Sequence, residues 1–238
     1  MKLGIMQPYF FPYLGYFSLI RRTDQWIVFD TAQFIRHGWV NRNRILHPND
    51  GWQYILAPVR KHSRETPIAQ IELDNRQDWR GRLLGQLVHY KKQAPFYADT
   101  VAFLEQALAF QTDSLAEMNV HLLAAVCRRL RIPFNPRFFS AMDLPLGPIA
   151  GPGDWALRIS QALGAAEYIN PPGGAALFDP DAFARAGIRL TINPYEPLVY
   201  PCGRYHFEPG LSVIDAMLWN PVERLADHLA AAPLPAAA

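Results

Sequence analysis

The residues best suited to chemistry lie in one short segment that combines guanidinium, amide, imidazole and indole side chains. The segment carries Gln33, Arg36, His37, Trp39, Asn41, Arg42, Asn43 and Arg44. Guanidinium groups donate parallel hydrogen bonds to phosphate or carboxylate oxygens, amides both donate and accept, and an indole stacks on a flat ring. This mixture predicts a site for a phosphorylated, ring-bearing ligand such as a nucleotide or nucleotide sugar. The alternative is a solvated strand with surface charges.

A second predicted wall of the site is the aromatic segment 8–17, which follows the first apolar stretch directly. From this neighbourhood we expect four residues to line a pocket: Gln7, Tyr9, Gly15 and Tyr16. A glycine at the start of a helix allows a phosphate or carbonyl to approach the backbone closely. The segment lacks the repeated glycines of dinucleotide and P-loop motifs, so those two kinds of site are disfavoured. The alternative is that the rings pack together as an aromatic cluster.

Acid–base chemistry needs a titratable side chain, and the sequence offers two candidate catalytic residues. Asp30 ends a second apolar stretch, and it either acts as a base, binds a ribose hydroxyl or caps the following turn. His206 lies two residues before Glu208, a spacing that gives no triad by itself. A third apolar stretch ends in residues that either bind ligand or form a plain tight turn: Asn170, Gly173 and Gly174. No His-x-x-x-His or Cys-x-x-Cys spacing occurs, so we expect neither a metal site nor a cofactor.

Composition limits the classes of protein to consider. Half of the 238 residues are hydrophobic and 18% are charged, which predicts a substantial buried core. A formal net charge of +2 gives little support to a nucleic-acid partner. The two cysteines form no disulfide pattern, the first residues do not resemble a signal peptide, and no apolar stretch is long enough to span a membrane. We therefore expect a cytoplasmic protein, and the oligomeric state stays open.

The elements that would position these residues alternate between strands and helices. Strands are expected at residues 2–7, 25–30, 137–140, 167–170 and 188–192, and a hairpin at residues 45–58 around Asp50-Gly51. The alternation predicts an α/β, Rossmann-like fold whose mostly parallel sheet has helices on both faces and ligands at the carboxyl ends of its strands. A helical insertion or subdomain over about 78–131 is expected within one domain, 1–238. We also expect an edge strand at 68–73, one helix over 211–231, and fraying after Ala230.

Two long motifs carry a resemblance to a known family. They are Met6-Gln7-Pro8-Tyr9-Phe10-Phe11-Pro12-Tyr13-Leu14-Gly15-Tyr16-Phe17 and His37-Gly38-Trp39-Val40-Asn41-Arg42-Asn43-Arg44-Ile45. Together with segments 167–174, 178–179 and 207–215, they resemble the WbqC-like protein family over most of the chain. Two departures stand out. The family usually has two acidic residues where this chain has Asp30-Thr31, and it often has a basic residue where this chain has Arg36-His37 before Gly-Trp.

The resemblance implies a role associated with bacterial surface-polysaccharide and O-antigen loci. For some members it implies transfer of glycine, or a similar aminoacyl group, to an amino sugar. The first strand and helix start also resemble the HxGH nucleotidyltransferase superfamily, which has a HUP-type topology and a Gly-His pair that contacts phosphates. Here Gly15-Tyr16 occupies that position, and tyrosine supplies no imidazolium. The resemblance supports a related sheet topology, whereas the tyrosine argues against direct nucleotidyl transfer.

The working hypothesis is an enzyme that adds an aminoacyl (glycyl-like) or acyl group to the amine of a nucleotide-linked amino sugar. Its donor is a carrier-protein thioester, a CoA ester or an aminoacyl-tRNA, and the small net charge argues mildly against tRNA. One alternative is a nucleotidyltransferase-like enzyme that uses an NTP. Another is a non-catalytic partner within a polysaccharide assembly.

Overall fold

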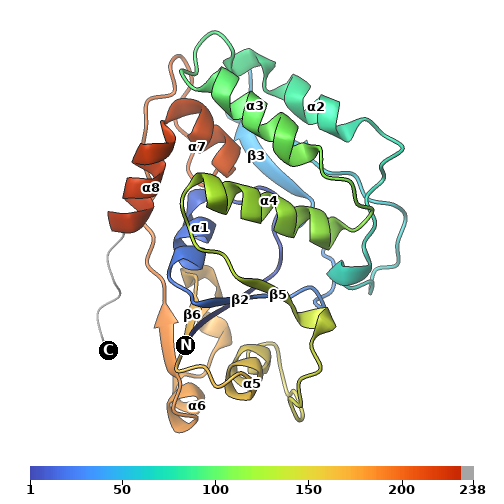
Figure 1. Ribbon diagram of the computed structural model, residues 1–238, viewed down its shortest axis with the longest axis vertical. Helices are drawn as coiled ribbons and strands as arrows, with labels where there is room; N and C mark the ends of the chain where they lie inside the picture. The colour runs from blue at the N-terminus through green and yellow to red at the C-terminus, as the bar shows by residue number, and fades with distance from the viewer. Residues whose placement is uncertain (232–238) are drawn as a thin grey trace.

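The protein is built around a five-stranded parallel sheet of order β5-β2-β1-β6-β7 (Figure 1). The structure, a computed structural model, describes residues 1–231. The strands are β1 (Lys2–Met6), β2 (Gln25–Val28), β5 (Pro136–Phe138), β6 (Glu167–Asn170) and β7 (Arg189–Ile192). Each neighbouring pair runs parallel. The predicted α/β, Rossmann-like fold with a mostly parallel sheet is confirmed.

The central strands are apolar on both sides because helices cover both faces of the sheet. Along β2, Trp26 and Val28 belong to a large buried cluster that also contains residues of α1, α4 and α8. Ile27 points the other way and belongs to a second cluster with residues of α5 and α6. Figure 1 shows α5 and α6 on one side of the sheet, with α1 and α4 on the other. The bounds are α1 (Leu14–Arg21), α4 (Leu115–Arg129), α5 (Asp154–Ala162), α6 (Pro180–Arg185) and α8 (Val222–Ala231).

The remaining α-helices and an antiparallel hairpin lie on the α1 side of the sheet. Gly51 turns the hairpin with a φ of +65°, a conformation that suits glycine. The hairpin strands are β3 (Arg42–Leu46) and β4 (Trp52–Leu56), and the helices are α2 (Trp79–Gln86), α3 (Tyr97–Leu108) and α7 (Val213–Trp219). Short 3₁₀ turns span Ile68–Gln70, Val88–Tyr90, Phe139–Ala141 and Pro172–Leu177. A separate subdomain over 78–131 stays a prediction.

Two predicted elements were wrong. The segment expected as an edge strand at 68–73 begins with a 3₁₀ turn, and its paired residues form only isolated bridges. Its first two buried residues, Ile68 and Ile71, are three apart, which suits the 3₁₀ turn, whereas Ile71 and Leu73 keep strand-like spacing in the part that forms the isolated bridges. The helix expected over 211–231 is two helices, α7 and α8, because Pro221 cannot continue α7. The Ala/Pro-rich end from residue 232 lies outside the described residues.

No helix within residues 1–231 is long and apolar enough to cross a membrane. Both cysteines, Cys127 and Cys202, are buried and free.

A buried carboxyl group ties the hairpin to α7. Asp215 is 1% exposed and accepts hydrogen bonds from the hydroxyls of Tyr90 at 2.6 Å and Tyr200 at 2.9 Å. The Tyr90 hydroxyl also accepts from the main-chain nitrogen of Leu46 at the end of β3. Burial raises the pKa of Asp215 from 3.8 to about 6, although both tyrosine hydrogen bonds act to lower it.

This raised pKa predicts that Asp215 makes the protein less stable as pH rises. The folded carboxyl group binds its proton more tightly than the unfolded one, so its stabilising contribution is complete below about pH 4 and is lost by about pH 6. The shift corresponds to roughly 3 kcal/mol in the free energy of unfolding. We expect the free energy of unfolding of wild type, relative to that of the non-titrating variant Asp215→Asn, to fall by about this amount as pH rises through this window, as measured by denaturant titration. A difference that does not change with pH would contradict the prediction.

Candidate functional site

The Pro/aromatic loop after β1 is held by hydrogen bonds to its main chain. The main-chain nitrogen of Phe10 donates to the carbonyl of Trp39 at 3.0 Å, and Asn43 Nδ2 donates to the carbonyl of Phe10 at 3.1 Å. From α4, Asn119 Nδ2 donates to the carbonyl of Pro8 at 2.8 Å. Asn119 also donates to the carbonyl of Val40 at 2.6 Å. The two motifs of the sequence are therefore joined to each other and to α4.

The C-terminal part of this loop is fixed in a demanding conformation. Phe11 has a φ of +41°, which is costly for a residue with a large side chain. Ser212 Oγ donates to the carbonyl of Phe11 at 2.8 Å, and the main-chain nitrogen of Val213 donates to the carbonyl of Pro12 at 2.9 Å. Contacts from the start of α7 thus stabilise a backbone shape that the local sequence would not adopt alone.

Of the four residues expected here, Gly15 and Tyr16 are buried in the core, and Gln7 and Tyr9 are half-buried beside them. Tyr16 is 2% exposed, and its hydroxyl donates to the carbonyl of Gln7 at 2.7 Å. The rings of Tyr9 and Tyr16 lie 5.6 Å apart, and burial raises the pKa of Tyr9, which is half-buried. Gly15 is buried where a Cβ atom would collide with the rings of Tyr13 and Tyr195. This geometry gives Gly15 a packing role.

The hairpin separates the Asn/Arg run into an inner and an outer face, because successive side chains of a strand point in opposite directions. Asn43 is 4% exposed and faces the core, whereas Arg42 and Arg44 share the outer face. The Arg42 guanidinium lies 3.9 Å from the centre of the Tyr54 ring and also donates to the carbonyl of His37. These contacts hold the Arg42 side chain in place, so little freedom remains to be lost on binding a ligand.

Beside Arg42 lies a cavity of about 690 Å³ whose lining is strongly basic. We call it the basic groove and define it by its cationic and imidazole residues: Arg36, His37, Arg42, Arg60, Lys61, His62 and Arg82. Tyr54 and Asn41 also line it, and no acidic residue is among its described lining. Within residues 1–231, Arg60 is the groove cation that has carboxylate partners within 4 Å, namely Glu72 and Asp113. The other cations give the groove a net positive charge.

Several residues of the basic groove were not expected from the sequence. Lys61, His62, Arg82 and Tyr54 come from the loop after β4, from α2 and from β4. The run Arg60-Lys61-His62 is the one local signal that points to this part of the site. Arg82 carries no such signal because the tertiary fold alone brings α2 beside the hairpin.

Three other residues expected in the site, Asp30, Asn170 and Gly173, lie outside the basic groove. Asp30 is 1% exposed, and its oxygens accept from the main-chain nitrogen and the hydroxyl of Ser140 at 2.9 and 2.5 Å. Asn170 is 5% exposed, accepts from the Tyr168 hydroxyl, and lies against Gly174. Asp30 follows β2, Asn170 ends β6, and Gly173 comes just after it, so all three lie at the carboxyl edge of the sheet. None of them lines the basic groove.

Gln33 lies before the groove and donates to the carbonyl of Arg64 at 2.7 Å. This bond joins the segment that precedes Arg36 to the loop that carries Lys61 and His62. Asn41 donates to the carbonyl of Ala57 at 3.0 Å, next to the end of β4. The side-chain amides of Gln33 and Asn41 therefore join the segments that form the sides of the groove.

The exposed side chain of His206 belongs to a segment that runs along the edge of β3. Arg204 donates to the carbonyl of Pro48 at the hairpin turn, at 3.2 Å. Arg44 donates to the carbonyl of Gly210 at 3.4 Å, and the main-chain nitrogen of Ser212 donates to the carbonyl of Arg44 at 2.8 Å. The structure thus attaches the His206 segment to the same hairpin that carries the arginines.

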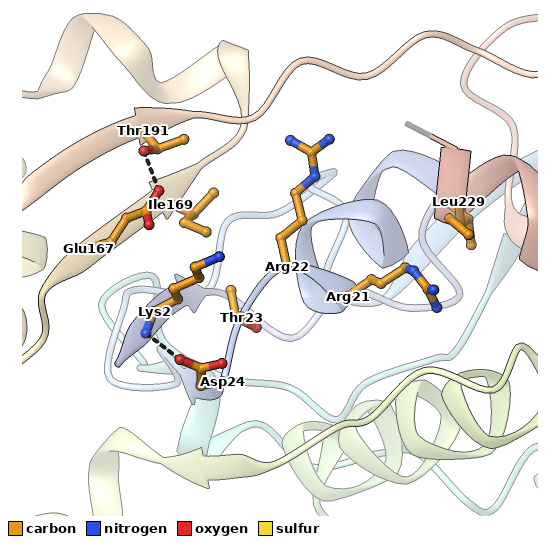
Figure 2. A pocket seen from close by; sticks show the side chains of 10 residues that line it. Lys2, Arg21, Arg22, Thr23, Asp24, Glu167, Ile169, Thr191 and Leu229 are labelled. Atoms are coloured by element: carbon orange, nitrogen blue, oxygen red, sulfur yellow. Dashed lines mark hydrogen bonds between the residues drawn. The ribbon is translucent and has the colours of Figure 1, made fainter. Parts of the chain in front are cut away.

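A second cavity, of about 420 Å³, lies near the amino ends of β1 and β6, opposite the carboxyl ends of the strands where Asp30 and Asn170 lie (Figure 2). Its charges are of both signs. The Glu167 carboxylate accepts from the Thr191 hydroxyl at 2.5 Å, and Asp24 accepts from the main-chain nitrogen of Lys2 at 2.7 Å. A cavity with such a lining suits a polyphosphate less well than the basic groove does. Within residues 1–231, no three His, Cys, Asp or Glu side chains gather as a metal site would require.

Comparisons with known proteins agree on the family. The model of the WbqC-like protein family matches residues 7–227. The chain is similar to the uncharacterized protein Rv1507c of Mycobacterium tuberculosis, with 29% identity over 230 residues that cover 96% of this chain and 97% of that protein. No solved structure matches it. The matched region contains the second motif in full and the first from Gln7 onward, and the chain belongs to the WbqC-like protein family.

Proposed function

We propose that the protein transfers an acyl or aminoacyl group to the amine of a nucleotide-linked amino sugar in surface-polysaccharide biosynthesis. The observation that carries this proposal is the basic groove, where Arg36, Arg42, Lys61 and Arg82 gather without an acidic neighbour in the lining. Guanidinium groups bind phosphate oxygens through pairs of parallel hydrogen bonds. The Tyr54 ring beside Arg42 offers a flat surface for a sugar or base.

The reaction needs a base that takes a proton from the sugar ammonium. The free amine then attacks the carbonyl carbon of the donor, a C–N bond forms, and the bond to the donor's sulfur or oxygen breaks as that atom takes up a proton. We assign the base to His206, whose side chain is exposed on the segment beside β3. Both oxygens of Asp30 already accept from Ser140, so we assign Asp30 a positioning role.

We expect His206→Ala to lower kcat by about 100-fold or more, with KM changed far less. General base catalysis contributes about 100- to 10,000-fold, and this step belongs to the transition state and not to substrate binding. Steady-state kinetics on the purified enzyme measure both constants. The assignment of the base fails if kcat and KM worsen equally. Asp30→Asn serves as the comparison, because we expect it to lower the melting temperature: its amide has a single oxygen and cannot accept both hydrogen bonds from Ser140.

A thermal-shift screen tests the proposed function. A UDP- or dTDP-linked amino sugar at about 100 times its Kd should stabilise the protein by about 2.7 kcal/mol, which raises Tm by roughly 5–10 °C for a domain of this size. Stabilisation only by an NTP with Mg²⁺ would favour the nucleotidyltransferase alternative. A lack of response to every phosphorylated ligand would contradict the proposal and favour a non-catalytic partner.

A further inference from the structure

Two exposed indole rings flank one guanidinium on the outer face of the hairpin. Trp39 and Trp52 are 38% and 39% exposed, and the Arg44 guanidinium lies 5.5 Å from the first ring centre and 5.0 Å from the second. We call these three residues the tryptophan strip. Large aromatic rings exposed side by side favour a binding partner, because water solvates their faces poorly.

The tryptophan strip continues into the basic groove along the same face of the hairpin. Arg44 pairs directly with Tyr54 in the strand register, and the rings of Trp52 and Tyr54 lie 4.9 Å apart. The Arg42 guanidinium lies 3.9 Å from the centre of the Tyr54 ring. Aromatic rings and guanidinium groups therefore lie next to one another across this surface. Proteins bind a single nucleic-acid strand by stacking its bases on aromatic rings within a basic track that contacts its phosphates.

The local charge also exceeds what a nucleotide sugar requires. Its diphosphate carries about two negative charges, whereas Arg44 adds to four groove cations even when Arg60, which has carboxylate partners, is left out. The protein's formal net charge of +2 conceals this concentration. The remaining positive charge suits a second polyanionic ligand next to the first.

We infer that the acyl donor of the proposed reaction is the single-stranded, aminoacylated 3′ end of an RNA, bound on the tryptophan strip. This inference rests on the proposed function. The sugar amine attacks the carbonyl carbon of the aminoacyl ester, the C–N bond forms and the ester C–O bond breaks. The released ribose hydroxyl gains the proton that the amine loses, and His206 on the segment bonded to Arg44 relays it. No other reactant is needed.

Fluorescence anisotropy with a labelled single-stranded RNA of about eight nucleotides tests this inference, since such sites span about 4–16 nucleotides. Wild type should bind the RNA, and Trp52→Ala should weaken binding at least about fivefold, because each stacked base contributes about 1–3 kcal/mol. Arg44→Ala should make the dependence of binding on salt less steep. Phe110→Ala, which removes an exposed aromatic ring on another surface, is the matched control and should bind as wild type does.

The same variants titrated with a UDP-linked amino sugar separate the two proposals. Trp52→Ala should weaken RNA binding by a larger factor than nucleotide-sugar binding. Wild type that binds the nucleotide sugar but not the RNA would overturn this inference and leave the proposed function intact. RNA binding that Trp52→Ala and Phe110→Ala weaken equally would also overturn it. RNA binding that depends on Trp52, without nucleotide-sugar binding, would support an RNA site on the tryptophan strip. It would contradict the nucleotide-linked amino sugar as the acceptor in the proposed function.

Discussion

Replacing Arg42 by alanine is expected to weaken the binding of a nucleotide-linked amino sugar by about 10- to 150-fold. A hydrogen bond to a charged group contributes about 1.5–3 kcal/mol, and 1.36 kcal/mol corresponds to a factor of ten. Arg42 lies against Tyr54 and is bonded to the carbonyl of His37, so its guanidinium is held in the basic groove before a ligand arrives. Isothermal titration of each purified variant measures the change in Kd.

Two further arginine variants make this result specific. Arg82→Ala removes a groove cation from α2 and should also weaken binding, whereas Arg189→Ala removes an exposed cation from β7, outside the groove, and should not. All three variants lose the same charge. Equal Kd values for Arg42→Ala and Arg189→Ala would show that bulk charge, and not the groove, governs binding.

The second large effect is expected for Asn119→Ala, which should lower the free energy of unfolding by about 2–5 kcal/mol. Asn119 is fully buried on α4, and its Nδ2 donates hydrogen bonds to the carbonyls of both Pro8 and Val40. Each buried carbonyl left without a donor costs about 1–3 kcal/mol. The variant should also weaken ligand binding, because Val40 lies between Trp39 and Asn41. Denaturant titration measures the change in stability.

Gln111→Ala is the control for this loss of an amide. The Gln111 side chain is exposed and donates only to the carbonyl of Ala109 within the described structure. Its removal should change the free energy of unfolding by less than about 0.5 kcal/mol. If Asn119→Ala lowers the free energy of unfolding no more than Gln111→Ala does, the hydrogen bonds of Asn119 do not hold the two motifs together.

The sheet could be predicted because its strands carry their signal locally. The run Trp26-Ile27-Val28 is apolar at consecutive positions, which is typical of a strand buried on both faces. The division of α7 from α8 also had a local signal in Pro221, which outweighs the apolar periodicity around it. The turn at Ile68–Gln70 had only a weak local signal, since a short apolar segment fits either a strand or a helical turn.

The candidate site was only partly predictable, since its parts meet through long-range contacts. Arg36, His37, Asn41 and Arg42 do line one groove, but Lys61 and Arg82 arrive from other elements. The roles of the amides depend on distant partners. Asn43 reaches the carbonyl of Phe10, 33 residues away, and Asp30 reaches Ser140, 110 residues away. Strand alternation alone separates Asn43 from its arginine neighbours, so that division was available from the sequence.

The most direct test of the central account is a competition titration on the wild-type protein. The basic groove is proposed to bind the diphosphate of a nucleotide-linked amino sugar, so UDP should displace a UDP-amino sugar, while the free amino sugar should not. Isothermal titration calorimetry with each ligand gives the three affinities. Binding of the nucleotide sugar and of UDP, both weakened by Arg42→Ala, is the predicted result. Binding of the free amino sugar as tight as that of its nucleotide-linked form, or no effect of Arg42→Ala, would contradict the account.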